Sequence, residues 1–387
     1  MKRKGRVVLL MLCLIPLSCG DTFLIQGDSP GVISTVAGGA VEVAQTGASA
    51  LEVTIVLPGQ VIAGDDGDFY ILETGFNRLL YVDSGGKLTR IAGNTTSGFS
   101  GDGGDALDAL LASPLGFDID SDGNIYIADT GNHRVRMIDT SGKIRTIAGT
   151  DVPGFYGDGL AAEEAGLFKP TDVVAGPKGM IYISDFGNNR IRMIDTDGII
   201  QTICGTGDYS FNGNAIPAVE ANLSQPSGLD IDSQGNLYIA VTGYHRVRMI
   251  DTSGEIFTLA GSGSPGFGGD GEQAISAQLN EPVDVFVMDD GRGFYIADRR
   301  NQRVRFVDDN GMIFTVAGNG ESGYNGDGLF ATEASLYEPS GISVDIFDNL
   351  YIADKDNYRI RRVPFPLAAR EGSQGEGPKN PFGPKTR

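Results

Sequence analysis

The chain contains six copies of one segment, and this internal repetition restricts the fold more than any other property of the sequence. The segment NIYIADTGNHRVRMIDTSGKIRTIAG, at 124–149, has near copies along most of the chain. A tyrosine near the start of each copy marks a spacing of 56, 56, 56, 57 and 56 residues: Tyr70, Tyr126, Tyr182, Tyr238, Tyr295 and Tyr351. Such a period indicates repeated supersecondary units, each unable to bury its apolar surface without its neighbours.

Within one copy, apolar residues alternate with a period of two, which is typical of β-strands. Ile125 and Ile127 lie on one side of the first such segment and Tyr126 and Ala128 on the other, so both faces are apolar. Strands of this kind lie between two packed sheets. With DTSGK and DSDGN as hairpin turns, we expect four strands per unit, in the second copy at 114–120, 124–129, 134–139 and 143–149.

Six four-stranded antiparallel units predict an all-β fold, a six-bladed β-propeller. The first strand occurs six times, beginning near Pro58, Pro114, Pro170, Pro226, Pro282 and Pro339. The last copy stops after its third strand, at 361–363, whereas an extra strand, VISTVAGG at 32–39, precedes the first full unit. We expect this N-terminal strand to complete the last blade and to close the ring over 32–364.

Long loops connect the units, and GFSGDG at 98–103 recurs in related form at 154–159, 266–271 and 323–328. Units with these loops and with the YIAD, RVR and IAG segments resemble the NHL repeat, and the resemblance covers about residues 32–364. It implies the propeller fold. It does not imply one function, because propellers of this family host protein binding, RNA binding, sensing and some enzymes.

The N-terminus predicts export. Residues 1–18 have the pattern of a signal peptide, with the basic MKRKGR followed by a short apolar run, and no later segment is long and apolar enough to span a bilayer. PLSCG is similar to the lipobox of bacterial lipoproteins, which predicts lipidation of Cys19 in the cell envelope. Ordinary cleavage and an uncleaved anchor are the alternatives. We expect 19–31 to be a tether and the lipid to be the only membrane attachment.

Composition limits the partners. The formal net charge of −20 becomes −24 when 1–18, with their four positive charges, are removed. So acidic a surface repels phosphate backbones, and we expect no nucleic-acid partner. The segment 365–387 is rich in Pro and Gly and is predicted to be a disordered tail. Cys204 replaces an alanine of other copies, which predicts a small buried residue, and the mature chain cannot form a disulfide framework.

Several acidic and basic residues recur from copy to copy, which favours a structural role over a single site. Asp129 is followed by Arg134 and Arg136, and most copies share this group. We expect the arginines to donate charged hydrogen bonds between blades, to carboxylates or turn carbonyls. Glu73 in the first copy and Val241 in the fourth break the pattern. Such departures are predicted to carry more functional information than the repeats.

Two acidic motifs have both a structural and a ligand-binding interpretation. The stretch DIDSDGNIYIAD at 118–129 resembles an EF-hand calcium loop, but it lies on a predicted hairpin without flanking helices, so we interpret it as a turn. Asp102 of GFSGDG precedes an alanine-rich stretch, and we expect a turn that leads into a short helix with the acid near its N-terminus. Calcium binding at the first motif and metal or ligand contact at the second are the alternatives.

In an antiparallel blade, the turns between the second and third strands emerge on the same face as the connections between blades. We predict that this loop-rich face is the binding surface, since its turns differ between copies and carry side chains that interfaces favour. The candidates are Tyr244, His245, Arg299, Arg300, Tyr358 and His133. The two histidines are the only ones in the chain, and we expect them to be loop residues without a shared role. They cannot supply the axial zinc cluster that the amidating lyase branch of this fold would need.

A further pattern lies two residues after each first-strand proline, where polar residues alternate with glycine: Gln60, Gly116, Asp172, Gly228, Asp284 and Gly341. If these side chains point into the channel, Gln60, Asp172 and Asp284 could hold Ca²⁺, another divalent cation or a water cluster. The alternative is a position that accepts Gly or Asp freely.

The sequence therefore predicts an exported, lipid-tethered and monomeric ring that binds a protein or small ligand through its loop-rich face. The alternative is a propeller enzyme of the lactonase or lyase type with a divalent cation in the axial pocket. We lean against catalysis, because no Ser/His/Asp grouping, histidine cluster or single-copy acid pair stands out beyond Asp172 and Asp284. Sensing of a small ligand in the channel is a third possibility that no residue separates from the first. The sequence identifies neither partner nor substrate.

Overall fold

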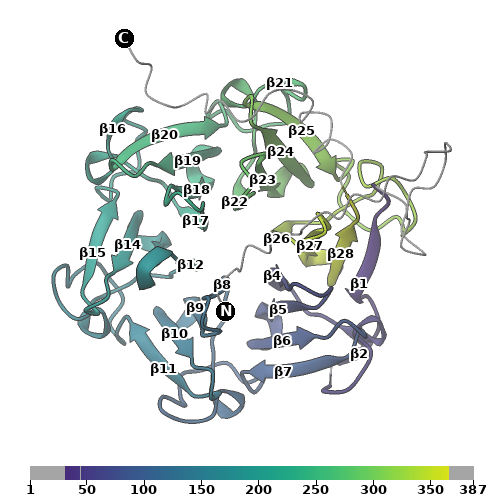
Figure 1. Cartoon of the computed structure of the whole chain (residues 1–387), viewed down its shortest axis with the longest axis horizontal. Helices are drawn as coiled ribbons and strands as arrows, with labels where there is room; N and C mark the ends of the chain where they lie inside the picture. Colours follow the sequence, from purple (N-terminus) through teal and green to yellow (C-terminus); the bar gives the residue numbers. More distant parts are fainter. Residues whose placement is uncertain (1–30, 44, 366–387) are drawn as a thin grey trace, which may run out of the picture.

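Six sheets surround a central axis in the computed structural model, which describes residues 31–43 and 45–365 (Figure 1). Within the described part of the chain, no helix is long and apolar enough to cross a membrane. The predicted signal peptide, Cys19 with almost all of the predicted tether, and all but the first residue of the predicted tail lie outside the described residues.

Each sheet is one blade whose strands follow one another from the axis outward. Blade one contains β4 (Pro58–Ala63), β5 (Phe69–Glu73), β6 (Arg78–Val82) and β7 (Leu88–Ala92), and blade two contains β8 (Phe117–Ile119), β9 (Ile125–Asp129), β10 (Arg134–Ile138) and β11 (Ile144–Ala148). Blade three contains β12 (Asp172–Ala175), β13 (Ile181–Asp185), β14 (Arg190–Ile194) and β15 (Ile200–Cys204). The predicted four-stranded antiparallel blades are confirmed.

Blades four and five each gain a fifth, two-residue strand at the outer edge. Blade four contains β17 (Pro226–Ile231), β18 (Leu237–Val241), β19 (Arg246–Ile250) and β20 (Glu255–Ala260), with β16 (Ile216–Pro217) outside. Blade five contains β22 (Pro282–Val287), β23 (Gly293–Asp298), β24 (Arg303–Asp308) and β25 (Met312–Ala317), with β21 (Glu272–Gln273) outside. A short parallel pair, β2 (Glu42–Val43) and β3 (Val53–Thr54), precedes blade one.

Blade six confirms the predicted closure of the ring. It contains β26 (Pro339–Val344), β27 (Leu350–Asp354) and β28 (Arg359–Val363), and its outermost strand is β1 (Ser34–Gly38) from the N-terminus. The pairing runs from Ser34 opposite Arg362 to Gly38 opposite Arg359. The register shift within β1 also occurs between the third and fourth strands of the other five blades, so β1 occupies the position of a regular fourth strand.

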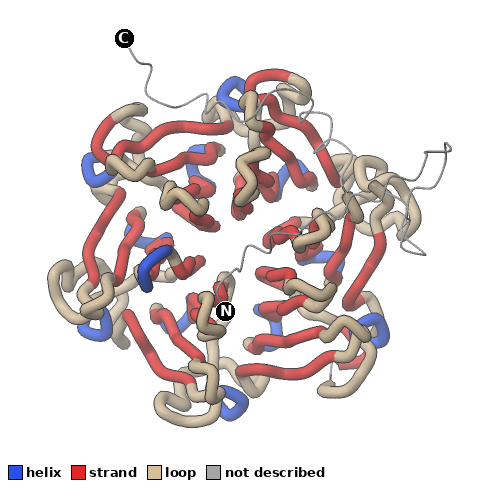
Figure 2. The backbone as a smooth tube through the Cα atoms, viewed as in Figure 1, coloured by secondary structure: helices blue, strands red, loops and turns tan. Residues whose placement is uncertain are grey.

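Short 3-10 helices lie within the loops (Figure 2). Six lie between the second and third strands: η2 (Thr74–Phe76), η4 (Thr130–Asn132), η7 (Phe186–Asn188), η9 (Thr242–Tyr244), η11 (Arg299–Asn301) and η12 (Lys355–Asn357). We call these turns, 74–77, 130–133, 186–189, 242–245, 299–302 and 355–358, the rim turns. The others are η1 (Ala50–Glu52), η3 (Ala106–Asp108), η5 (Ala162–Glu164), η8 (Ala218–Glu220) and η10 (Ala274–Ser276) before the first strands, and η6 (Pro177–Gly179) in blade three.

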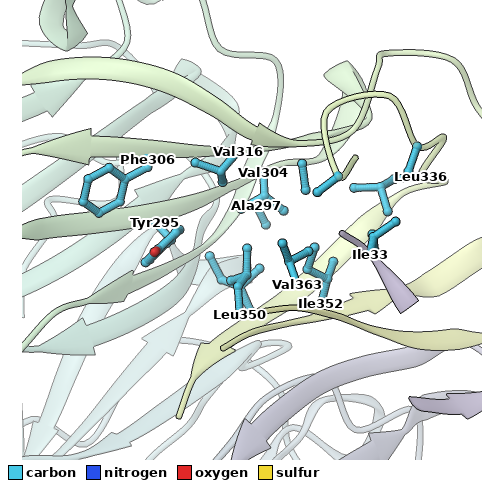
Figure 3. Close-up of a cluster of buried hydrophobic side chains, with 14 residues drawn as sticks. Ile33, Tyr295, Ala297, Val304, Phe306, Val316, Leu336, Leu350, Ile352 and Val363 are labelled. Carbon is cyan, nitrogen blue, oxygen red and sulfur yellow. The ribbon is translucent and has the colours of Figure 1, made fainter. Parts of the chain in front are cut away.

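The hydrophobic core of the described residues is divided into six clusters, and each combines residues of two neighbouring blades. Figure 3 shows the cluster of blades five and six, where Ile352 and Val363 of blade six face Ala297 and Val304 of blade five, and Ile33 of the N-terminal segment adds to it. Because every blade contributes to a cluster on each side, its strands are apolar on both faces. The alternation on both strand faces is thereby explained.

Buried arginines connect each long loop to its blade. Arg136 is fully buried, and its Nη2 lies 2.7 Å from Oδ1 of Asp102 in the GDG loop while Nη1 lies 3.4 Å from Oδ2 of Asp129. The ring of Phe99 packs 4.8 Å from the guanidinium. The same grouping occurs around Arg192, Arg305 and Arg361. The predicted charged hydrogen bonds to carboxylates are confirmed, but the expectation that they run between blades is wrong, because each arginine contacts its own blade and the loop leading to it.

The two acidic motifs form turns, and the acid of the GDG loop forms an ion pair. Asp105, not Asp102, caps the following 3-10 helix, through a 3.0 Å hydrogen bond from the Leu107 N–H. The predicted turn that leads into a short helix is confirmed at 102–108, but the GDG acid does not cap that helix, because Asp102 pairs with Arg136. In the calcium-loop-like stretch, Asp120 accepts hydrogen bonds from the backbone of Asp122 and Asn124, as a hairpin turn requires.

Candidate functional site

A pocket of about 100 Å³ lies at the ring axis, on the face that carries the rim turns. Its floor is the ring of alternating residues that the sequence singled out, including Gln60, Asp172 and Asp284. Its wall contains residues next to the first-strand prolines, and Arg299 and Lys355 of two rim turns complete it. The pocket therefore brings together three of the predicted cation-site residues and one of the predicted binding-face residues.

The floor alternates between polar residues and glycine because the first strands of neighbouring blades pack closely against each other. A Cβ on Gly228 would lie 2.6 Å from Cα of Asp284 and 2.7 Å from the Val283 carbonyl oxygen, both in the next blade. On Gly116 it would lie 2.8 Å from Cα of Asp172, and Gly341 faces Gln60 in the same way. Each polar side chain thus covers a glycine of the preceding blade. The position does not accept Gly or Asp freely, which corrects the alternative considered from the sequence.

The carboxylates of the floor accept hydrogen bonds from the next blade. Oδ2 of Asp172 accepts the Leu229 N–H at 2.7 Å, and Oδ2 of Asp284 accepts the Ile342 N–H at 2.8 Å. These bonds join blade three to blade four and blade five to blade six, and a second, deeper layer joins blade four to blade five. These carboxylates hold first strands together, which is a structural task.

The deeper layer was missed from the sequence. Oδ2 of Asp118 accepts the Ala175 N–H at 2.8 Å, Oδ2 of Asp230 accepts the Val287 N–H at 2.7 Å, and Oγ of Ser343 accepts the Ala63 N–H at 3.1 Å. These residues stand two positions after a floor glycine, so a blade with Gly at the first position has its acceptor at the third. The pattern GFD, GLD and GIS was the available signal.

Burial raises the pKa of the carboxyl groups in both layers. It raises the pKa of Asp284 to about 7 and that of Asp230 to about 8. Burial also raises the pKa of Asp172 well above its ordinary value, and the neighbouring carboxyl of Asp284 raises it further. The floor is therefore partly protonated near neutral pH, which weakens it as a ligand set for a divalent cation.

Two cationic side chains interrupt the repeat in the rim turns. In blades one and four, the first residue of the turn is threonine, and Oγ1 of Thr74 or Thr242 donates a 2.7 Å hydrogen bond to the proline carbonyl oxygen of the next blade. Arg299 and Lys355 replace this threonine in blades five and six, and both line the pocket. The substitutions place positive charge on one side of the axis.

An ion-pair network surrounds Arg299. It pairs with Glu281 and, at 3.5 Å, with Glu338, while Arg300 lies 3.2 Å from Glu281 and 2.7 Å from Glu338. The network holds Arg299 at the edge of the pocket. The two arginines lower the pKa of Glu281 against the effect of its burial, so this acid stays ionised. Burial lowers the pKa of the Lys355 ammonium, and the charge of Arg299 lowers it further.

The remaining predicted face residues lie away from the pocket floor. Nδ1 of His133 accepts the Lys169 N–H at 3.1 Å, and Nδ1 of His245 accepts the Glu281 N–H at 3.0 Å. Side-chain oxygens make the equivalent contact in three other blades, at Asn77, Asn189 and Gln302. The expectation that the histidines have no shared role is therefore wrong. Tyr358 is 43% exposed, whereas Tyr244 is buried against Phe211.

Blade four departs from the repeat beneath its rim turn. Arg248 is fully buried like its equivalents, but Val241 and Asn214 replace the two acids that pair with it elsewhere. Its Nη2 donates to the Gly213 carbonyl oxygen at 2.7 Å, and Nη1 has no hydrogen-bond partner among the described residues. Burial lowers the pKa of this guanidinium to about 10. Cys204, predicted to be small and buried, is fully buried nearby in the core.

Over the described ranges, no three His, Cys, Asp or Glu side chains lie together in a way that could hold a metal ion. Asp172 and Asp284 already accept backbone N–H groups, and Arg299 and Lys355 share their pocket. A cation at Gln60, Asp172 and Asp284 stays a prediction from the sequence, and the chemistry of these donors gives it little support.

The architecture and the axial pocket define a six-bladed β-propeller with a pocket on its loop-rich face. A model of the Teneurin NHL domain matches residues 95–153 and 151–213. NHL repeat-containing protein 2 of Gallus gallus is 28% identical over 340 residues, which cover 79% of this chain and 46% of that protein. These matches support NHL-type repeats in this β-propeller, and the chain spans about half the length of the curated relatives it matches first.

Solved structures share the fold at low sequence identity. A Bacteroides thetaiotaomicron protein of unknown function is similar with a TM-score of 0.63 at 19% identity, over 86% of this chain and 75% of that one. An auxiliary nutrient binding protein of Bacteroides ovatus is similar with a TM-score of 0.61 at 17% identity, over 86% of this chain and 76% of that one.

Proposed function

We propose that this propeller is a binding module that takes a small ligand into the axial pocket of its loop-rich face. The observation that carries the proposal is the break in the repeat at the pocket. The fold does not require a cation at the first rim-turn position, because Thr74 and Thr242 bond the next blade there and Phe186 occupies it in blade three. Arg299 and Lys355 give up that contact and line the pocket instead.

Such a replacement has a cost that the fold does not require. Two cations lie close enough that Arg299 lowers the pKa of Lys355, and burial adds to the effect. Residues that destabilise a repeat at one place, next to a cavity, are candidates for recognition. The pocket also sits where propeller blades leave a concave space, so a ligand can contact several blades at once.

The predicted location belongs to the same proposal. Export, and lipidation at Cys19, would tether the ring at the cell envelope with its binding face free to meet small molecules. The Bacteroides ovatus nutrient binding protein, which shares the fold, offers one example of a propeller given a binding role. Binding of a protein partner to the rim turns, with Arg300 and Tyr358 as contacts, is the other form that the predicted interface can take.

A ligand screen with a blocked pocket tests the proposal. The full-length protein is screened by thermal shift against a library of small polar metabolites, beside Ser227→Trp, which fills the pocket wall. Asp122→Trp, at an exposed hairpin tip away from the pocket, is the matched control. We expect at least one compound to stabilise the wild type and the control but not the blocked variant. If every stabilising compound acts equally on all three proteins, the axial pocket is not the binding site.

A further inference from the structure

The chemistry of the pocket indicates what kind of ligand it takes. Resting on the function proposed above, we propose that the ligand is a small monocarboxylic acid, whose carboxylate is bound by Lys355 at the edge of the axial pocket. Arg299 faces the same space from the neighbouring blade. The proposal depends on the charge balance around Lys355, on the lining of the wall and on the state of the floor.

The arginines beside the pocket are already neutralised. Arg299 and Arg300 together contact Glu281 and Glu338, which makes a network of two positive and two negative charges. Lys355 adds a further positive charge, and no acid of the described residues lies within ion-pair distance of its ammonium. The Lys355 ammonium is therefore not held in an ion pair, although Asp356 and Glu338 attract it from a greater distance, and Lys355 lines the pocket. A ligand with one negative charge can pair with this ammonium, whereas a dianion such as phosphate would find no second unpaired cation.

A half-buried ammonium beside a second cation favours an anionic partner. Charge-assisted hydrogen bonds between an ammonium and a carboxylate are roughly twice as strong as neutral ones. Without a ligand, the desolvation of the Lys355 ammonium and the repulsion of Arg299 outweigh the attraction of Asp356 and Glu338, and the pKa of the ammonium is lowered. A bound carboxylate would compensate both, and it would leave the Arg299 network in place.

The wall suits the rest of such a molecule. Leu115 and Val283 offer apolar contacts, and Thr171, Ser227 and Ser340 bring hydroxyl groups to the same ring. A short alkyl or hydroxyalkyl chain finds both kinds of partner there. The volume of about 100 Å³ restricts the ligand to a small one.

The carboxyl groups of the floor repel an anionic ligand only weakly. Asp172 and Asp284 direct oxygen atoms to the backbone of the next blade, and burial raises the pKa of both. Because a raised pKa favours the neutral form of both carboxyl groups, the floor repels an anion less than two ionised carboxylates would. The positive edge of the pocket is then its main electrostatic feature.

Titration calorimetry on the full-length protein tests the ligand class with propionate, lactate and propionamide. Propionamide has nearly the shape of propionate without the charge. We expect propionate or lactate to bind and propionamide not to bind. Lys355→Thr should weaken carboxylate binding by about tenfold or more, because a charged hydrogen bond is lost. Lys355→Arg keeps the charge and should retain much of the binding.

The variants are matched to the repeat. Threonine stands at this position in blades one, two and four, so Lys355→Thr is compatible with the fold. Lys143→Thr, in an exposed hairpin, removes the same charge elsewhere and should leave binding unchanged. The proposal is overturned if propionamide binds as well as propionate, if Lys355→Thr binds carboxylates normally, or if no monocarboxylate binds at millimolar concentration.

The two proposals fail differently. If a neutral or cationic compound binds the wild type and not Ser227→Trp, the pocket is a binding site and only the carboxylate assignment is wrong. If inorganic phosphate binds more tightly than propionate in a Lys355-dependent way, the pocket takes anions and the monocarboxylate assignment is again wrong. If no compound distinguishes Ser227→Trp from the wild type, the proposed function fails together with the assignment.

Discussion

Gly228→Ala tests whether the axial ring is held together by interlocking blades. The added Cβ would lie 2.6 Å from Cα of Asp284 and 2.7 Å from the Val283 carbonyl oxygen. Both are backbone atoms of blade five, so no side chain can rotate away and the two blades must separate. That separation would also strain the hydrogen bond from Ile342 to Asp284, which joins blades five and six.

Overpacking of a well-packed site costs about 1–3 kcal/mol, and we expect the upper part of this range because the obstacle is backbone. Alanine recovers about 0.4–1 kcal/mol by restricting the unfolded chain. The net loss in the free energy of unfolding should thus be about 2 kcal/mol, measured by chemical denaturation. Gly268→Ala is the control, since its added Cβ meets only the flexible Gln278 side chain, at 3.3 Å. Equal losses in the two variants would refute the interlocking argument.

Three further predictions concern the same scaffold. Burial raises the folded pKa of Asp230 to about 8, above the ordinary value near 4, so the folded state binds this proton more tightly than the unfolded state. The free energy of unfolding should therefore fall as pH rises from about 4 to about 8, by at most about 1.4 kcal/mol per pH unit. Denaturation midpoints between pH 5 and 8 should depend less on pH in Asp230→Asn, and an unchanged dependence would contradict this role of Asp230. Arg136→Met should lower the free energy of unfolding by about 3–5 kcal/mol, because buried Asp129 loses its charged partner. Arg248→Met should lower it much less, because Arg248 has no such acid beside it. Equal losses in chemical denaturation would show that the acids do not matter. His133→Ala should lose about 1 kcal/mol with the inter-blade hydrogen bond, and His133→Gln should retain most of it, as judged by thermal melting against the wild type.

The ring itself could be predicted from the sequence because its evidence is local and repeated. A constant spacing gives the number of blades, and counting strands shows that 32–39 must complete the last one, as its pairing with β28 confirms. No long-range contact had to be known. The buried arginines followed in part from the same logic, since a residue present in most copies is more often structural than catalytic.

The site was harder to predict because its contacts join residues of different copies. Asp172 and Gly116 stand 56 positions apart, and their steric relation appears only when the first strands are arranged around the axis. Asp118 and Asp230 were missed for the same reason. Lys355 was visible as a departure from threonine in the aligned rim turns, but its importance depends on the pocket beneath it. The shared role of His133 was hidden because histidine, asparagine and glutamine share an acceptor atom rather than a shape.

The pairing of β1 with β28 also sets the order of events when the protein is made. Within the ring, Ser34 is synthesised before all of the blades, yet its partner Arg362 follows almost all of them. Until then, β1 has no strand beside it, and blade six lacks its outer edge. Blades one to five can form during synthesis, but the circle is completed only after residue 363 has appeared. Chains that stop before β28 would therefore keep two exposed edges that invite association with other chains.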